Sequence, residues 1–170
     1  MPGGHGYAFI EFGDPGRSAH SAAVYVRGGN ISPEFYWEDA PVETKSFVLT
    51  LHDPDAPRRD GFTHWLLYDI PPNITRIREG LPPQAPALDA GVQGKNDFGK
   101  LGYSGPCPPS GTHRYFARLY ALRKPVGLPS GATASDIKSA LEGKVIEQTE
   151  LMGTFAKGSA ENQAKAANRR

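Results

Sequence analysis

Short apolar runs recur along the chain and are separated by clusters of glycine and proline. Four of these runs are strand-like, at residues 22–26, 47–51, 65–70 and 115–122. Short apolar runs between turn residues predict an antiparallel sheet packed against a second layer. The run 47–51 is almost continuously apolar, as expected of a central strand that is covered on both faces.

One helix is predicted near the C-terminal end of the chain. Three apolar side chains share a helical face there: Ile137, Ala140 and Leu141. Thr133 or Ser135 can serve as the N-cap, and Gly143 is placed to end the helix. Residues 144–151 are compatible with a further helical turn or with a strand.

The length and composition fit one mostly β domain. The 170 residues include 20 glycines and 16 prolines, which favours turns over long helices. We assign residues 1–157 to a single domain. Residues 158–170 are polar, contain no large apolar side chain, and are predicted to form a disordered tail.

Charge and cysteine usage exclude several classes of function. The formal net charge is +1, so there is no basic excess for binding nucleic acid. Cys107 is the one cysteine, and no intramolecular disulfide can form. The N-terminal residues do not have the pattern of a secretory signal, and no apolar stretch approaches the roughly 20 residues that span a bilayer. We therefore expect a cytoplasmic protein without a transmembrane segment.

Asp53 and Asp55 directly follow the run 47–51. On an extended backbone, two residues that are two positions apart point to the same side. The prolines at 54 and 57 make this segment rigid. A turn with two solvated acids explains the segment as well as a binding site does.

Two histidines also lie at the ends of predicted strands. A lone histidine at the start of an apolar strand, as at His64, is more often structural than functional. Strand alternation places His113 and Tyr115 on one face and Arg114 on the other. An arginine that faces a covered layer needs a carboxylate, so we expect Arg114 to pair with Asp53 or Asp55.

Three kinds of site are compatible with two imidazoles and an acid. A face of two histidines and one carboxylate can bind a metal, but the usual close His-and-acid spacing is missing. A catalytic triad would need Ser104 or Cys107 as nucleophile, and neither follows a strand-to-helix elbow. An anion site, with donors from histidine N–H groups and from backbone N–H groups around Gly105, fits best.

Several ordered motifs resemble those of the phosphatidylethanolamine-binding protein family, most closely its bacterial and archaeal Raf-kinase-inhibitor-like branch. The similarity extends from about residue 28 to residue 156. The motifs that carry it are Asn30-Ile31-Ser32-Pro33, Asp53-Pro54-Asp55-Ala56-Pro57, Thr63-His64-Trp65, 91–100, 102–109 and Gly111-Thr112-His113-Arg114-Tyr115.

This resemblance implies a β-sandwich-like fold with a central antiparallel sheet, a smaller second sheet, and one or two short C-terminal helices. It also implies a small pocket for phosphate, acetate or a phosphorylated head group. The positions that match the family's pocket are Asp53, His64, Gly105, Pro106, His113 and Tyr115. The positions that match its supporting residues are Asp55, Pro57 and Arg114, and the resemblance together with the sharp turn predicts a cis bond before Pro57.

The function implied is binding without catalysis. We expect a regulatory protein that binds phosphate-like anions or phospholipid head groups, needs no cofactor or metal, and can form a homodimer. Because the matched pocket positions contain no lysine, positive charge there would come from imidazolium, and anion affinity would rise from about pH 8 to 6. The competing functions are a protein-interaction module that inhibits a protease or kinase, and a hydrolase or metal-dependent enzyme.

Overall fold

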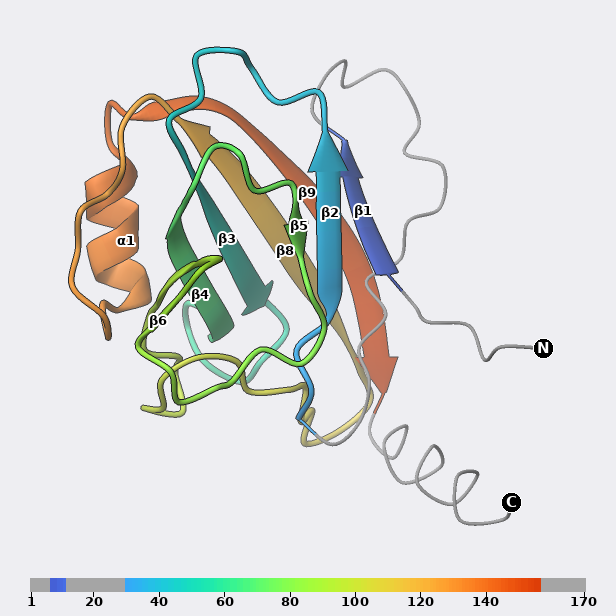
Figure 1. Ribbon diagram of the computed structural model, residues 1–170. Coiled ribbons are helices and arrows are strands. Elements are labelled where there is room, and N and C mark those ends of the chain that lie inside the picture. Colours follow the sequence, from blue (N-terminus) through green and yellow to red (C-terminus); the bar gives the residue numbers. More distant parts are fainter. Residues whose placement is uncertain (1–6, 12–29, 157–170) are drawn as a thin grey trace.

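The computed structural model describes residues 7–11 and 30–156 (Figure 1). The strand predicted at 22–26 and the tail at 158–170 lie outside these residues. No helix in the described part of the chain is long and apolar enough to cross a membrane.

A large antiparallel sheet forms the centre of the molecule. Its strand order is β6-β7-β4-β3-β8-β9. The strands are β3 (Ser46–Asp53), β4 (Phe62–Ile70), β6 (Ala87–Leu88), β7 (Gly91–Gln93), β8 (Thr112–Leu122) and β9 (Val145–Ala156). The apolar run at 47–51 is the central part of β3, which pairs with β4 on one side and β8 on the other. Residues 145–151 therefore form a strand, because their backbone completes the ladder beside β8.

A smaller sheet covers one face of the large one. It consists of β1 (Tyr7–Glu11), β2 (Glu34–Glu38) and β5 (Arg76–Ile77) in the order β1-β2-β5. The β1–β2 pair is parallel and the β2–β5 pair is antiparallel. The predicted combination of a central antiparallel sheet and a smaller second sheet is confirmed.

The described residues contain one helix, α1 (Ala134–Leu141), where one or two were predicted. Thr133 is its N-cap and forms a capping box with Asp136, in which each side chain bonds the backbone N–H of the other. The chain leaves the helix at Glu142 and Gly143, and Gly143 has a φ of +70°. The helix packs on the face of the large sheet away from the small one (Figure 1).

Strand alternation divides the apolar core into two layers on either side of the large sheet. Leu49, Leu51 and Trp65 pack beneath the small sheet, whereas Val48 and Leu66 pack beneath α1. The large sheet is thus covered on both faces, which accounts for the continuous apolar sequence of β3.

The described residues contain no cis peptide bond, so the prediction of a cis bond before Pro57 is wrong. The chain reverses by other means. The Arg58 N–H donates to the Ala56 carbonyl at 2.7 Å, and Gly61, with a φ of +70°, closes the turn before β4. This hydrogen bond and the conformation of Gly61 form the turn without a cis bond.

Candidate functional site

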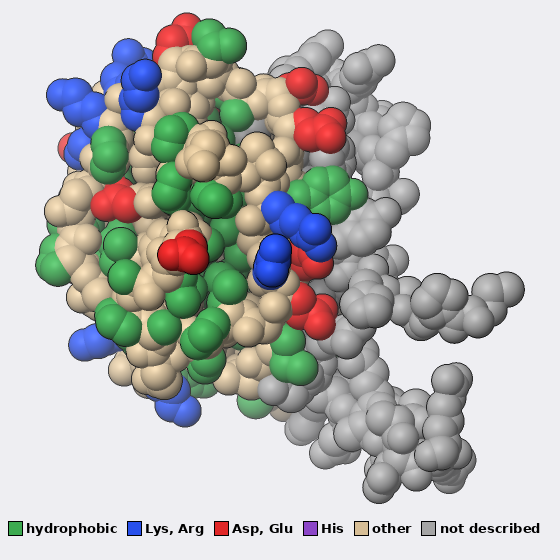
Figure 2. Space-filling model, in the orientation of Figure 1, with side chains coloured by type: hydrophobic (Ala, Val, Ile, Leu, Met, Phe, Trp, Pro, Cys, Tyr) green, Lys and Arg blue, Asp and Glu red, His purple; other side chains and the backbone are tan. Residues whose placement is uncertain are grey.

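The predicted site residues come together at one end of the large sheet. Because β3 lies between β4 and β8, the end of β3 lies beside the start of both neighbours. This topology places Asp53 near His64 on one side and near His113 on the other. The three side chains are buried, with exposed fractions of 2%, 3% and 7% respectively. No histidine is visible on the face shown in Figure 2.

Asp53 and His113 form the central pair of the site. His113 Nδ1 lies 2.7 Å from Asp53 Oδ2. The other carboxylate oxygen of Asp53 accepts the backbone N–H of Asp55 at 2.8 Å. Since a carboxylate can only accept, His113 Nδ1 carries the proton, and Nε2 is the nitrogen left for a ligand. The aspartate thus orients this imidazole.

His64 is held on the other side of the site by backbone. Its Nδ1 lies 2.8 Å from the Ser104 carbonyl oxygen, which again requires an N–H at Nδ1. Burial lowers the pKa of His64, and this effect exceeds the opposing influence of the Ser104 carbonyl and the Asp53 charge. His64 is therefore a neutral ring, and its Nε2 is an acceptor.

Two tyrosine hydroxyls line the same region. The Tyr103 and Tyr115 hydroxyl groups are buried and have no hydrogen-bond partner among the described residues. Burial, then the charge of Asp53 and the proximity of the Tyr115 hydroxyl to that carboxylate, raises the pKa of Tyr115, while burial alone raises that of Tyr103. Both hydroxyls are therefore neutral donors. A buried donor without a partner calls for an explanation, and a bound acceptor is one.

Gly105 lies beside these hydroxyls. A methyl group on its α carbon would lie 3.5 Å from Tyr103 Oη, so the backbone passes close to the tyrosine. The Gly105 N–H donates to Asn30 Oδ1 at 2.7 Å. The prediction that this N–H is available to an anion is therefore wrong for Gly105 itself, because Asn30 already accepts it.

Aromatic rings surround His64. Its ring lies 5.4 Å from Tyr115, 4.9 Å from Phe62 and 5.8 Å from Phe98, measured between ring centroids. Phe98 is 47% exposed. The rings of Phe62 and Phe98 thus form an apolar edge beside a polar interior.

The supporting residues lie outside the buried pair. Arg114 donates through Nε and Nη2 to the two carboxylate oxygens of Asp55, at 2.9 and 2.8 Å. The predicted pairing with Asp53 or Asp55 is confirmed, but the predicted burial is wrong, because the Arg114 side chain is 54% exposed. None of the described residues forms a layer over the outer face of β8 at that point. Pro57 is exposed and Pro106 is half-buried.

The two alternatives that the sequence left less favoured, a metal site and a catalytic triad, gain no further residues in the described part of the chain. Among the described residues, no group of three or more His, Cys, Asp or Glu side chains could hold a metal ion. Cys107 is exposed, and Ser104 Oγ accepts from the Asn96 side-chain amide at 2.9 Å.

Comparisons with known proteins identify the family of this chain. The sequence model of the family described as phosphatidylethanolamine-binding protein matches residues 11–156. The chain belongs to the phosphatidylethanolamine-binding protein family. The predicted resemblance is confirmed over most of the chain.

Relatives from archaea and bacteria are similar to this chain in sequence. The UPF0098 protein of Methanothermobacter thermautotrophicus is 47% identical over 131 residues, which are 77% of this chain and 86% of that protein. The UPF0098 protein of Aquifex aeolicus is 46% identical over 131 residues, 75% of each chain.

Solved structures of the family have the same fold. CT736 of Chlamydia trachomatis, named as a phosphatidylethanolamine-binding protein homologue, is 40% identical with a TM-score of 0.67 over 75% of this chain and 82% of that one. YbcL of Escherichia coli, named as a member of the mammalian family, is 33% identical with a TM-score of 0.71 over 76% and 82%.

Two residues of the pocket region were missed as site residues by the sequence reasoning. Tyr103 and Asn30 both fall in motifs that carry the family resemblance, but neither lies in a strand whose alternation would reveal its direction. Tyr103 is separated from His64 by 39 positions in the sequence, and long-range contacts, among them the hydrogen bond of 3.0 Å from the Ser104 N–H to the His64 carbonyl, bring that segment beside β4.

Proposed function

We propose that this protein is a non-enzymatic, regulatory binding protein whose pocket takes a phosphate-like anion or a phosphorylated head group. The observation that carries the proposal is the pair of buried tyrosine hydroxyls without a partner, beside the Asp53–His113 pair. The two hydroxyls are donors, and His113 would donate from Nε2 once protonated, while Asp53 only holds the imidazole; a phosphate oxygen can accept from these three donors.

The tautomers define how the pocket would respond to pH. Both histidines use their Nδ1 proton within the protein, so a neutral ring presents Nε2 as an acceptor only. A protonated ring would instead donate from Nε2. Burial keeps His64 neutral, so His113 is the histidine whose protonation would strengthen anion binding.

The chemistry of the edge supports a head group over a free anion. Phe62 and Phe98 place apolar rings next to the donors, and Phe98 is half-exposed. A glycerol or ethanolamine substituent on the phosphate would contact these rings. Membership of a family described as phosphatidylethanolamine-binding supports the same ligand class. A cytoplasmic location, a homodimer and a protease or kinase as partner stay predictions.

Calorimetric titration with glycerophosphoethanolamine tests the proposal, because its phosphodiester keeps one negative charge between pH 6 and 8. Affinity should rise as the pH falls from about 8 to 6. His113→Ala should weaken binding by about 1.5–3 kcal/mol, the usual contribution of a charge-assisted hydrogen bond. The same substitution should remove the pH dependence.

The substitution Tyr115→Phe distinguishes an effect on ligand binding from an effect on stability. It removes only the hydroxyl, so affinity should fall while the free energy of unfolding stays equal or increases, since the buried donor without a partner is gone. Tyr36→Phe, on the small sheet, is the matched control and should keep wild-type affinity. Equal affinity in wild type, His113→Ala and Tyr115→Phe would remove this pocket from the function.

A further inference from the structure

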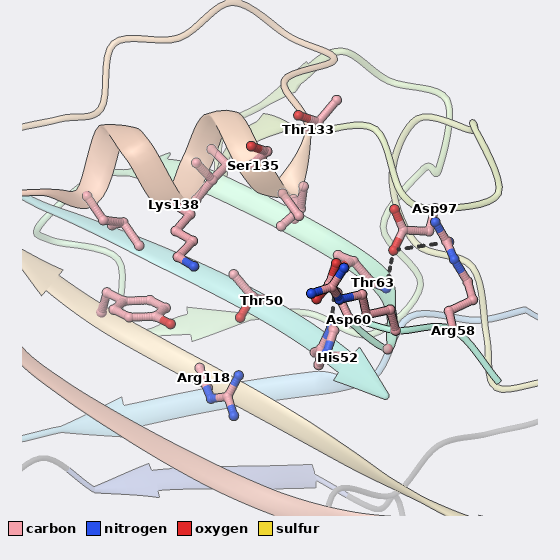
Figure 3. A pocket seen from close by; sticks show the side chains of 17 residues that line it. Thr50, His52, Arg58, Asp60, Thr63, Asp97, Arg118, Thr133, Ser135 and Lys138 are labelled. Carbon is pink, nitrogen blue, oxygen red and sulfur yellow. Dashed lines mark hydrogen bonds and ion pairs between the residues drawn. The ribbon is translucent and has the colours of Figure 1, made fainter. Parts of the chain in front are cut away.

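A second cleft lies on the opposite face of the large sheet, between α1, the ends of β3 and β8, and the turn 58–61 (Figure 3). Thr50 and Arg118 belong to its sheet side and Lys138 to its helix side. Its volume is about 810 Å³. Clefts that bind small molecules measure about 300–1,000 Å³, so this one has the size of a ligand site.

The cleft concentrates positive charge. Its lining contains four cationic side chains, Arg58, Arg59, Arg118 and Lys138, against two carboxylates, Asp60 and Asp97, whereas the whole chain has a net charge of +1. Arg58 is engaged with Asp97 at 3.6 Å. Within residues 30–156, no hydrogen bond or ion pair is recorded for Arg59 or Lys138. Two of the cations are thus unpaired.

Two contacts within the protein hold the Arg118 side chain in place. Its Nε donates to Glu150 at 2.9 Å, and its guanidinium lies 5.5 Å from the Phe116 ring. These contacts fix the side chain and leave its two terminal amino groups without a partner in the described part of the chain. Such a guanidinium can donate two parallel hydrogen bonds to a phosphate.

Figure 3 shows the Lys138 ammonium extending from α1 toward Thr50, with Arg118 on the other side of Thr50. The two positive groups come from different elements, and Arg118 is already paired with Glu150 through Nε. An anion between them would be within reach of the Thr50 hydroxyl. The positive charge of the cleft comes from side chains and not from the N-terminus of α1, because the capping box of Thr133 and Asp136 already occupies that first turn.

The rest of the lining is apolar or neutral. Leu66, Ile137, Leu141 and Tyr120 contribute hydrocarbon and ring surface. His52 contributes no charge at neutral pH, because burial and then the positive charge of Arg118 lower its pKa. A ligand with an apolar body and an anionic group therefore matches the cleft better than a bare ion does.

We propose that this cleft is a second binding site, for small organic phosphates whose phosphate group lies between Arg118 and Lys138 and whose apolar body contacts Tyr120, Ile137 and Leu141. The site shares no residue with the pocket at Asp53, so the two sites can be separated by mutation.

Calorimetric titration with phenyl phosphate at pH 7.5 tests the proposal, in a His113→Ala background that disables the first pocket. We expect saturable binding there, at least about tenfold tighter than that of inorganic phosphate. The double variant Arg118→Gln/Lys138→Gln, made in the same background, should weaken phenyl phosphate at least tenfold, because each charge-assisted hydrogen bond contributes about that factor or more.

Matched controls remove the same charge outside the cleft. Arg78→Gln/Lys124→Gln in that background changes the net charge equally and should leave the affinity unchanged. Lys138→Gln alone replaces an exposed side chain without altering the fold and should weaken binding severalfold. The proposal is overturned if phenyl phosphate does not bind in the His113→Ala background. It is equally overturned if both double variants weaken binding to the same extent, which would be a general charge effect.

Discussion

The two faces of the large sheet present two polar regions of opposite construction. The pocket at Asp53 is built from buried side chains, of which Asp53, His64 and His113 bond one another or the backbone. The cleft beside α1 is lined by long cationic side chains whose charged ends are exposed or half-exposed. The strands beneath them are the same: Asp53 and His52 are neighbours in β3 and face opposite sides. A buried polar side chain therefore also contributes to the stability of the fold. An exposed polar side chain can be substituted at little cost in stability.

The largest expected effect is at the buried pair. Asp53→Ala leaves His113 buried without its acceptor and removes the acceptor of the Asp55 N–H. We expect the free energy of unfolding to fall by about 3 kcal/mol. Urea denaturation measures this loss, with Asp60→Ala, an exposed carboxylate of the cleft, as the control. Equal stability of the two variants would show that burial does not distinguish the two faces.

Ligand binding in the cleft should depend on the stability of α1. Thr133→Ala removes the N-cap side chain of α1, whose hydroxyl accepts the Asp136 N–H and donates to the Asp136 carboxylate, at a cost of about 1 kcal/mol. Phenyl phosphate should then bind the cleft more weakly, because Lys138 is positioned by that helix, while glycerophosphoethanolamine binding should not change. A parallel loss at both sites would contradict their independence.

Acid should destabilise the protein through its neutral histidines. The pKa values of His64 and His52 are lowered in the folded state, so the unfolded chain binds more protons as the pH falls below about 6.5. Stability is therefore highest above that value and declines as the pH falls toward the folded-state pKa values. Urea denaturation at pH 7, 6 and 5 should show the decline, and His64→Gln should reduce its slope. An unchanged slope would mean that His64 does not become more readily protonated on unfolding.

The smallest effect is expected at the exposed ion pair. Arg114→Gln removes the bidentate contact with Asp55, but both side chains remain in solvent and exposed pairs contribute little to stability. The thermal midpoint should stay close to that of wild type, and what change there is should diminish in 1 M salt. A fall as large as that of Asp53→Ala would place Arg114 in the buried network.

The sequence alone predicted the core strands, the helix and the central residues of the pocket. The apolar runs at 47–51, 65–70 and 115–122 became β3, β4 and β8, because a short apolar run between turn residues has few ways to bury its side chains other than a covered strand. Alternation likewise placed His113 and Tyr115 on one face of β8 and Arg114 on the other. The ordered motifs likewise predicted family membership, since they mark a site that is assembled from several segments.

Tertiary structure decided what local pattern cannot specify. Whether Arg114 is buried depends on whether another layer covers that end of β8, and none does among the described residues. Whether residues 144–151 form a helix or a strand depended on the free edge of β8, whose ladder they complete. The Gly105 N–H was committed to Asn30, 75 positions away, and the cationic cleft arose from three elements whose charges are far apart in the sequence. Such contacts follow from the packing of distant segments, and no pattern within one segment contains them.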